Sequence, residues 1–303
     1  MYDTIHFWID RALLNNNPYR IKDCLSNIEE YDTTKGYYIK AGLRNFSVYI
    51  NDSGVSLKGS LSKFYFGNNI QSLSLENTFK AIEMLSDLLN ISLFDAKISR
   101  IDIGAVLITK YAPISYFKYF GNKRYFKRSQ YMENTLYYRT EKRSLAFYDK
   151  TIEAKKAKMN IPDEYLGKNL LRYELRFTQR IAFQLKENEI TGQTLCNNLF
   201  FSKLVTHWKN EYASIEKINS NHQLNYDEIS TPKEAKEAFM SMLLVNEDIS
   251  RIENYVNELK SNNTFVYPRD YTRLNKDLMN LLSNSSNNEN KQIIELNEKI
   301  MTL

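Results

Sequence analysis

The chain has 303 residues, about twice the commonest domain size, which favours one large domain or one domain with a smaller appendage. With 43% hydrophobic residues, a net charge of +5 and no run near the roughly 18 apolar residues that span a bilayer, it is expected to be soluble, with no membrane partner. The first residues, MYDTIHFWID, do not show the basic start and apolar run expected of a signal peptide. The two distant cysteines, Cys24 and Cys196, argue against a disulfide scaffold or zinc cluster and favour a reducing cytoplasm.

The first 109 residues alternate between strand and helix patterns. Four segments are predicted to be strands, namely residues 2–9, 46–50, 55–66 and 97–109. The second and third form a hairpin around the turn at residues 51–54, which ends in a glycine. Between the strands, Phe79, Ile82, Leu85 and Leu89 recur at helical spacing, which predicts an amphipathic helix over residues 75–89.

The second part of the chain continues this pattern and then becomes helical. Pro113 begins a short predicted helix that ends near residue 120. Further expected elements are a hairpin of strands 134–140 and 143–150, a helix over 151–158, a strand over 169–178, a helix over 234–259, a polar linker over 283–289 and a short helix over 293–303. We therefore predict an α+β domain over residues 1–203 and a helical region over 204–303.

Positive charge is concentrated in one block. Residues 118–158 contain twelve Lys and Arg but four Asp and Glu, a net charge of +8 in a chain whose total is +5. Aromatic residues are interleaved with these cations, at Tyr116, Phe117, Tyr119, Tyr125, Phe126, Tyr137, Tyr138 and Tyr148. Cations that hold phosphates beside rings that stack on bases indicate single-stranded nucleic acid. The alternatives are a solvated basic surface and, for some of the rings, the core of a sheet.

Three predicted strand segments carry ionisable residues on one face. Because side chains alternate along a strand, the residues that share a face are Arg100 with Asp102, Tyr148 with Lys150, and Arg172 with Glu174 and Arg176. If the three strands are neighbours, these groups converge. The alternative is a solvated sheet face, where alternating charges and Arg–Glu pairs are also common.

The convergent set suits phosphoryl transfer. Asp102 and Glu174 would bind a divalent cation, Mg²⁺ or Mn²⁺, that leaves positions for water and a phosphate. The cation and the arginines, Arg100 and Arg172, would stabilise charge on the phosphate. The Tyr148 oxygen would attack and form a phosphotyrosyl intermediate. Lys150 is expected to lower the pKa of the phenol or to orient the phosphate.

At these same segments the chain resembles the rolling-circle replication initiators of filamentous phages and small plasmids. The segments that carry the resemblance are MYDTIHFW at the start, GSLSKFYFGNN at residues 59–69, SRIDIGA at 99–105, NTLYYRTEKRSLAFYDKTIE at 134–153 and LLRYELRF at 170–177. The likeness covers roughly residues 1–180. It implies a mostly antiparallel sheet with helices packed on one face, and it places Tyr148 at the nucleophile of the pattern I-Y-N-K-x-x-E.

The chain departs from the larger initiator and relaxase superfamily in its histidines. That superfamily binds its metal through a His-hydrophobic-His pair, whereas this chain has only His6, His207 and His222 and no such pair. Carboxylates would then supply the ligands. His6 on the first strand is expected to be hydrogen-bonded within the sheet, with metal ligation as the alternative. Tyr138 is the second choice for the nucleophile.

The resemblance implies a bacterial cytoplasmic enzyme that nicks its origin through a 5′-phosphotyrosyl intermediate. The alternatives are a mobilisation relaxase and a non-catalytic protein that binds origin or single-stranded DNA. The expected partners are origin DNA with its single-stranded nick site and a host helicase, and self-association as a homodimer stays open. DNA contacts are expected from Lys63, Lys123, Arg124, Tyr138, Arg139, Lys142, Arg143 and Arg176.

Overall fold

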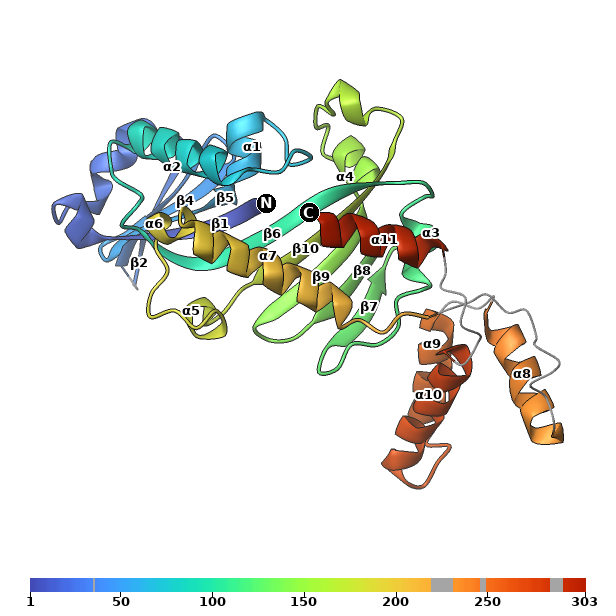
Figure 1. Ribbon diagram of the computed structural model, residues 1–303. Coiled ribbons are helices and arrows are strands. Elements are labelled where there is room, and N and C mark those ends of the chain that lie inside the picture. Colours follow the sequence, from blue (N-terminus) through green and yellow to red (C-terminus); the bar gives the residue numbers. More distant parts are fainter. Residues whose placement is uncertain (35, 219–230, 246–248, 284–290) are drawn as a thin grey trace.

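The computed structural model describes residues 1–34, 36–218, 231–245, 249–283 and 291–303. Its described residues form one ten-stranded sheet in the order β2-β3-β4-β5-β1-β6-β10-β9-β8-β7, with antiparallel pairing throughout (Figure 1). The strands are β1 Tyr2–Asp10, β2 Ser26–Thr33, β3 Gly36–Leu43, β4 Phe46–Asn51, β5 Gly54–Ser60, β6 Lys97–Thr109, β7 Lys127–Tyr131, β8 Thr135–Arg139, β9 Arg143–Asp149 and β10 Asn169–Phe177.

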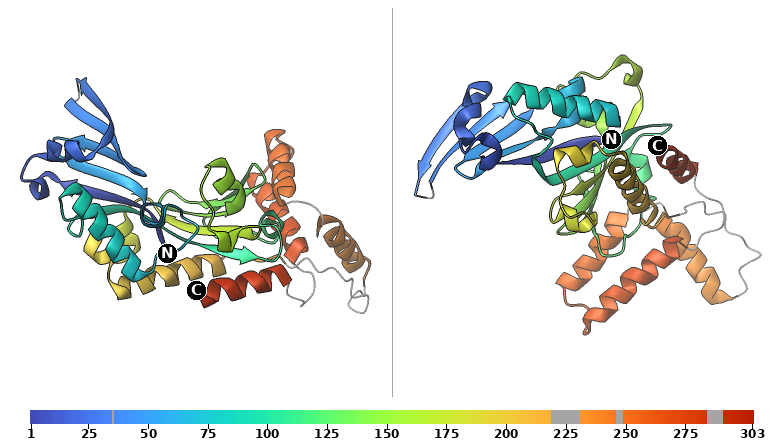
Figure 2. Two further views of the ribbon diagram at one scale, coloured as in Figure 1. Left: turned by 90° about the horizontal axis from the view of Figure 1, so that it is seen from above. Right: turned by 60° about the vertical axis from the view of Figure 1, so that its left-hand side comes forward.

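The helices lie mainly on one side of this sheet. They are α1 Leu61–Phe66, α2 Leu75–Leu89, α3 Ile114–Phe117, α4 Lys150–Lys156, α5 Ile181–Gln184, α6 Gly192–Leu195, α7 Asn198–Ala213, α8 Pro232–Val245, α9 Ile249–Ser261, α10 Pro268–Ser283 and α11 Lys291–Thr302, with the 3₁₀ turns η1 Arg11–Leu14, η2 Pro18–Cys24 and η3 Asp163–Tyr165. Figure 2 shows α2, α7 and α11 along the same side, which we call the covered face, and α4 on the other side, the open face. The predicted α+β class, with an antiparallel sheet and helices on one face, is confirmed.

The core fills the space between the sheet and the covering helices. Alternation along β9 and β10 sends Phe147 and Tyr173 to the covered face, where their rings stack with centroids 4.4 Å apart. Trp208 of α7 stacks on the other side of Tyr173 at 4.6 Å and is fully buried. Buried aromatic stacks of this kind contribute both buried apolar area and a preferred ring geometry. They fix which face of β9 and β10 stays open.

The region expected to be a helical appendage is divided. Helix α7 runs through the predicted boundary between residues 203 and 204, and Trp208 belongs to the main core. Helix α11, at the end of the chain, also packs there through Ile293, Leu296 and Ile300. A separate small cluster holds α8, α9 and α10 together, through Leu244 and the buried Ile218, Ile249, Ile252 and Met279. Only this second group forms an outlying helical unit among the described residues.

Several predicted elements differ from the structure. Residues 61–66 were expected to extend a strand but form α1, because the Ser60 side chain accepts the Lys63 N–H at 3.1 Å as an N-cap and Gly67 ends the helix in the left-handed region. The expected helix over 234–259 is described as α8 and α9, and residues 246–248 lie outside the described residues. Helix α10 and strands β2, β3 and β7 were not predicted. Of the expected linker, residues 284–289 lie outside the described residues. None of the described helices is long and apolar enough to cross a membrane.

Candidate active site

The open face brings the three predicted strand segments side by side. Strand β10 lies between β9 and β6, with Arg172 opposite Tyr148 and Arg176 opposite Asp102. Glu174 lies two residues from each arginine and therefore on the same face. The structure thus brings together the predicted nucleophile, both predicted metal ligands and the flanking arginines on one patch of sheet.

Glu174 is the centre of this patch. Its side chain is buried, and Oε1 accepts hydrogen bonds from the Tyr148 hydroxyl at 2.7 Å and from Arg172 Nε at 3.0 Å. Oε2 accepts from Arg176 Nε at 2.9 Å and from Arg176 Nη2 at 2.7 Å. A carboxylate has about four lone-pair sites, so these four donors occupy the acceptor capacity of Glu174. The tyrosine oxygen is therefore held in place by a group that is itself fixed by two arginines.

Two further residues of the patch were missed in the sequence. Asp3 accepts a hydrogen bond from Arg172 Nη2 at 2.7 Å and another from Asn69 Nδ2 at 3.2 Å, and the Asn69 carbonyl accepts from Arg172 Nη1. Asp3 faces this side because β1 contains a bulge between Tyr2 and Ile5, whose extra residue changes the alternation. Asp3 and Asn69 lie in MYDTIHFW and GSLSKFYFGNN, two of the segments that carry the family resemblance. Those segments were therefore the available signal.

Asp102 has a different environment from Glu174. It is 3% exposed and forms a bidentate pair with Arg100, from Nε to Oδ1 at 2.9 Å and from Nη2 to Oδ2 at 2.7 Å. Burial raises the pKa of Asp102 to about 6, in spite of the opposing effect of Arg100. Among the described residues, Arg100 gives each Asp102 oxygen one hydrogen bond, which leaves lone pairs for a further donor or a cation. Asp102 is the carboxylate with acceptor capacity to spare.

The electrostatics reverse one expectation. Burial raises the pKa of Tyr148 well above its usual value, the negative charge of Glu174 adds to the effect, and Arg172 only partly opposes it. For Glu174, burial acts to raise the pKa, but Arg172 and Arg176 outweigh it and hold the pKa at about 2. The proton therefore stays on the phenol in the resting protein. The pKa of this phenol is thus raised and not lowered, and the alternative role expected of Lys150, orienting the phosphate, stays a prediction.

Lys150 is placed differently from its prediction. Strand β9 ends at Asp149, whose side chain accepts the Ile152 N–H at 3.0 Å and so caps α4. Lys150 is consequently the first residue of a helix, fully buried, and its ammonium donates to Asn69 Oδ1 at 2.6 Å and to Glu153. Burial lowers the pKa of Lys150. Lys150 links α4 to the loop that carries Asn69, and its nitrogen lies 6.0 Å from the centre of the Tyr148 ring.

His6 lies on the same open face, towards β5. Its Nε2 is 2.5 Å from Ser56 Oγ and its Nδ1 is 2.8 Å from Ser99 Oγ. Both ring nitrogens have hydroxyl partners, so the prediction of a histidine hydrogen-bonded within the sheet is confirmed.

A cavity of about 520 Å³ lies beside the tyrosine. Tyr148, Arg176, Tyr137 and Lys156 are among its lining residues, together with the exposed ring of Tyr131. Arg139 stacks over Tyr137 with its guanidinium carbon 3.8 Å from the ring centre. The cavity thus combines cations with rings of the size of a nucleotide base, which is the chemistry that binds unpaired nucleic acid.

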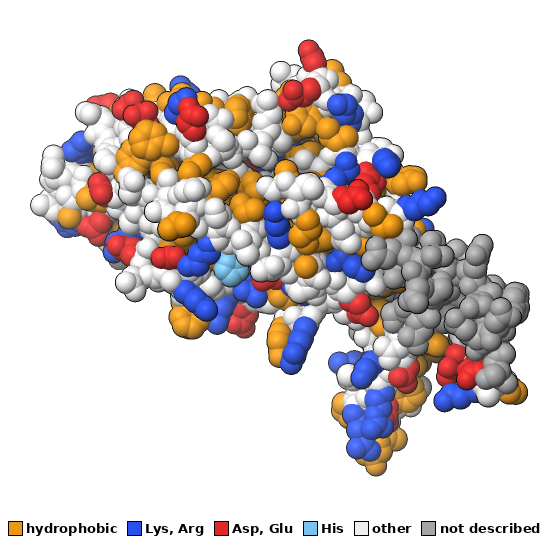
Figure 3. Space-filling model, viewed as in Figure 1, with side chains coloured by type: hydrophobic (Ala, Val, Ile, Leu, Met, Phe, Trp, Pro, Cys, Tyr) orange, Lys and Arg blue, Asp and Glu red, His pale blue; other side chains and the backbone are white. Residues whose placement is uncertain are grey.

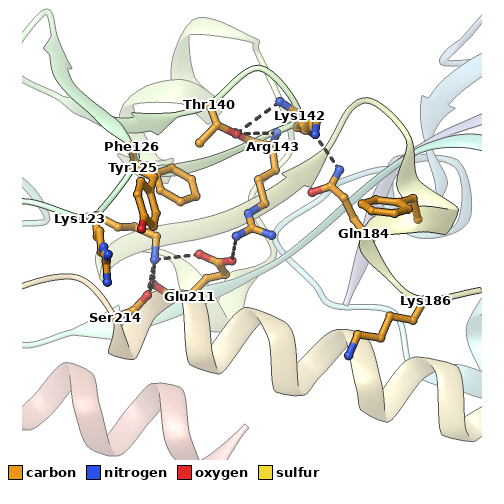
Figure 4. Close-up of a pocket in the computed structure, with 12 residues that line it drawn as sticks. Lys123, Tyr125, Phe126, Thr140, Lys142, Arg143, Gln184, Lys186, Glu211 and Ser214 are labelled. Carbon is orange, nitrogen blue, oxygen red and sulfur yellow. Dashed lines mark hydrogen bonds and ion pairs between the residues drawn. The ribbon is translucent and has the colours of Figure 1, made fainter.

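The residues expected to contact DNA separate onto different surfaces. Arg139 and Arg176 lie on the open face near Tyr148. Arg124, Lys142 and Arg143 instead line a cavity of about 800 Å³ at the edge of the covered face (Figure 4). The basic block of residues 118–158 is therefore not a single surface beside the nucleophile, because turns and strand alternation distribute it over both sides.

Two of these expected contacts are buried and have other partners in the structure. Lys123 is buried and paired with Glu211 at 2.8 Å. Tyr138 is fully buried and its hydroxyl donates to the Gly121 carbonyl at 2.6 Å, so it contacts neither DNA nor a scissile phosphate in this arrangement. Burial that the linear charge pattern does not reveal accounts for both corrections. Lys63 lies in α1, and its contact with DNA stays a prediction.

The donor set is compatible with a divalent cation at Asp102. Mg²⁺ is usually bound by one or two carboxylates together with water and substrate phosphate, and Asp102 has free lone pairs on a buried carboxylate. Glu174 could ligate only after one of its four donors moved away. Across the described residues, no group of three or more His, Cys, Asp or Glu side chains is arranged to hold a metal ion.

A family model matches most of the chain. A family described as the N-terminal part of the replication-associated gene II protein of phages matches residues 1–214. The match spans all ten strands of the sheet and helix α7, and so includes every residue of the patch around Glu174. A search of curated proteins found no match.

Proposed function

Since the chain belongs to this family of phage replication-associated proteins, we propose that it initiates rolling-circle replication by nicking one strand of its origin. The observation that carries this proposal is the Tyr148 hydroxyl, held 2.7 Å from a Glu174 oxygen among arginines on an open sheet face. A tyrosine in such a setting is a nucleophile with an acceptor for its proton.

The proposed step is an in-line displacement at one phosphodiester. The Tyr148 oxygen forms a bond to phosphorus, its proton passes to Glu174 Oε1, and the bond from phosphorus to the 3′-oxygen breaks. The 3′-oxygen takes a proton from solvent and becomes the 3′-hydroxyl that primes synthesis, while the 5′-phosphate stays on Tyr148. Because this ester retains a reactive phosphate, a later 3′-hydroxyl can displace the tyrosine and reseal the strand. Continued unwinding would require a host helicase.

The arginines have two roles in this proposal. In the resting protein Arg172 and Arg176 hold Glu174, which keeps the phenol oriented but protonated. Arg176 also lines the cavity beside Tyr148, where it would meet the scissile phosphate. A phosphate that shares Arg176 weakens the hold of that cation on Glu174. The pKa of Glu174 would then rise towards that needed to accept the proton of Tyr148.

A divalent cation, Mg²⁺ or Mn²⁺, is part of the proposal. Asp102 would hold it, and Glu174 would join if one of its donors moved to the substrate. Bound there, the cation would neutralise charge that develops on the phosphate. Arg100 positions the Asp102 carboxylate for this role through its bidentate pair.

The test is covalent capture of DNA. Labelled single strands that tile the replicon encoding the chain are incubated with the purified protein and Mn²⁺, and the products are separated on a denaturing gel. We expect a slowly migrating protein–DNA band with one origin strand, its loss in Tyr148→Phe, and its retention in Tyr137→Phe, which removes a hydroxyl from the same face. A band of equal strength in Tyr148→Phe would contradict the nucleophile. The absence of any band, with tight binding intact, would indicate a non-catalytic DNA-binding protein.

A further inference from the structure

The open face continues well beyond the patch around Glu174. Strands β1, β5, β4, β3 and β2 follow β6 in the sheet, and their pairing places Trp8 opposite Ser56, Ser56 opposite Tyr49, and Tyr49 opposite Lys40. Residues that are paired across antiparallel strands share a face. A single row of side chains therefore runs across β1, β5, β4 and β3 on the same side as Tyr148.

Aromatic rings and lysines lie on this remote part of the face, together with serines and the carboxylate of Glu29. Tyr38 stacks on Tyr31 of β2 with centroids 4.8 Å apart and an interplanar angle of 15°. The Tyr38 ring is also 5.2 Å from that of Tyr49, and Lys40 Nζ lies 4.9 Å from the centre of the Tyr31 ring. We call the group Trp8, Tyr31, Tyr38, Lys40, Tyr49 and Lys58 the far track. Its rings are half-buried and its two lysines are exposed.

The far track is not part of a core. Every aliphatic residue of β1, β3, β4 and β5 alternates to the covered face, where Val48, Ile50 and Leu57 are at most 3% exposed. Figure 2 shows α2 on that other side. On the covered side, seen in Figure 3, basic side chains are interspersed with acidic and apolar ones. The open face of the same strands thus presents rings, hydroxyls and lysines without an aliphatic partner surface.

The side chains of the far track indicate which class of molecule binds there. An apolar protein surface would need aliphatic contacts, which these strands direct to the covered face. Exposed lysines attract a polyanion, and half-exposed rings on a sheet stack on unpaired bases. At the outer edge of the sheet, the Tyr31 hydroxyl donates a hydrogen bond to the Glu29 carboxylate at 2.6 Å. Since neither lysine forms an ion pair with a described residue, both ammonium groups remain available to phosphates.

We propose that the far track binds the unpaired DNA strand that leads away from the nick site. This binding site extends the active site, and its role rests on the nicking function proposed above. His6 and Arg100 lie between the two parts of the face, so the surface is continuous from Tyr148 to Tyr31. Seven strand-to-strand steps separate β9 from β2. At about 4.8 Å each they span roughly 34 Å, the length of about ten nucleotides at the rise of one B-DNA strand.

The proposal predicts that DNA affinity depends on the length of the strand beside the nick. Two labelled oligonucleotides would be compared with the full chain, one with about three nucleotides on each side of the nick and one with about twelve. Affinity is measured by fluorescence anisotropy, and covalent adduct is measured on the same samples. We expect Trp8→Ala and Tyr49→Ala each to weaken binding of the long strand about tenfold, the usual scale for loss of one stacked base. Binding and adduct formation with the short strand should be unchanged.

Matched variants separate a lost contact from a lost fold. Tyr49→Phe keeps the ring and should bind the long strand like the wild type. Lys40→Gln should weaken the long strand and reduce the salt dependence of its binding. Tyr267→Ala, which removes an exposed ring beside α10 and away from both cavities, should change nothing. The far track would be rejected as a DNA site if Tyr49→Ala bound the long strand with wild-type affinity. It would also be rejected if this variant lost the same affinity for both strands. Absence of adduct in every sample, with the length dependence intact, would instead overturn the nicking function alone.

Discussion

The two faces of strands β9 and β10 use adjacent residues for opposite purposes. Tyr173 points to the covered face, where Phe147 and Trp208 stack on either side of it. Its neighbour Glu174 points to the open face and collects four hydrogen bonds from ionisable groups. One face therefore stabilises the sheet by packing and the other holds charge at a stability cost, since buried ions are expensive to desolvate. Packing on the covered face holds the strands rigid, and this fixes the positions of the charged side chains on the open face.

The largest effect on unfolding free energy is expected from a change on the covered face. Trp208→Ala removes a fully buried indole, and such changes typically cost about 3–5 kcal/mol of unfolding free energy. Urea denaturation would measure it. The fraction that remains folded should still form adduct at the wild-type rate, because the contacts of Trp208 with β10 are made to Tyr173, which points to the covered face. A stable variant that fails to form adduct would break the division between the two faces.

Removal of charge on the open face should act on cleavage. Asp102→Asn and Glu174→Gln are each expected to slow adduct formation at least about a hundredfold, the scale for loss of transition-state stabilisation. Chelation of divalent cations with EDTA should inactivate the wild type, and Mn²⁺ should restore it. Rates would be read from quenched samples on denaturing gels, with circular dichroism to confirm folding. Undiminished cleavage in EDTA would remove the cation from the mechanism.

The titration of Lys217, on the covered side, should change the unfolding free energy and leave cleavage unchanged. Burial, with a contribution from Lys123, lowers the pKa of Lys217 to about 7. The unfolded chain then carries a proton that the folded chain lacks between pH 7 and about 10, so unfolding free energy should rise with pH there by up to about 1.4 kcal/mol per unit. As pH falls towards 7 this gain is lost. Urea denaturation at pH 7, 8 and 9 should show the slope in the wild type and a flatter one in Lys217→Met. Parallel pH profiles would contradict it.

The smallest effect on unfolding free energy is expected from a matched pair of hydroxyls. Tyr173→Phe removes a hydroxyl that donates to the Trp208 carbonyl at 2.9 Å, and should cost about 1 kcal/mol of stability with cleavage intact. Tyr148→Phe removes the hydroxyl that donates to Glu174, and should abolish cleavage at a similar stability cost. Loss of cleavage in both variants would mean that the covered face takes part in the chemistry.

Strand alternation made the contents of the patch predictable. Arg100, Asp102, Tyr148, Arg172 and Glu174 were expected on one face, and the structure places them there. Alternation could not predict that Asp3 lies on this face, because a bulge in β1 reverses the alternation for one residue. Lys150 was misplaced because Asp149 caps a helix, a side-chain hydrogen bond that competes with strand continuation.

The remaining misses have physical causes in the sequence itself. Strand β2 is an edge strand with exposed residues almost throughout, so it has no apolar alternation to detect. The far track is dispersed over residues 8–58 and has no local excess of charge, so only the sheet order reveals it. The basic block shows the converse, because residues close in sequence, such as Tyr137 and Tyr138, point to opposite faces.

The most direct test of the account is the position of DNA on the chain. Trypsin cleaves after Arg143 and Lys150, so the peptide of residues 144–150, SLAFYDK, contains Tyr148 as its one tyrosine, whereas Tyr131, Tyr137 and Tyr138 share the peptide of residues 129–139. The adduct would be digested with trypsin and nuclease and mapped by mass spectrometry. A nucleotide phosphate is expected on SLAFYDK alone. A nucleotide on the 129–139 peptide would contradict the assignment of Tyr148 as the nucleophile of the open face.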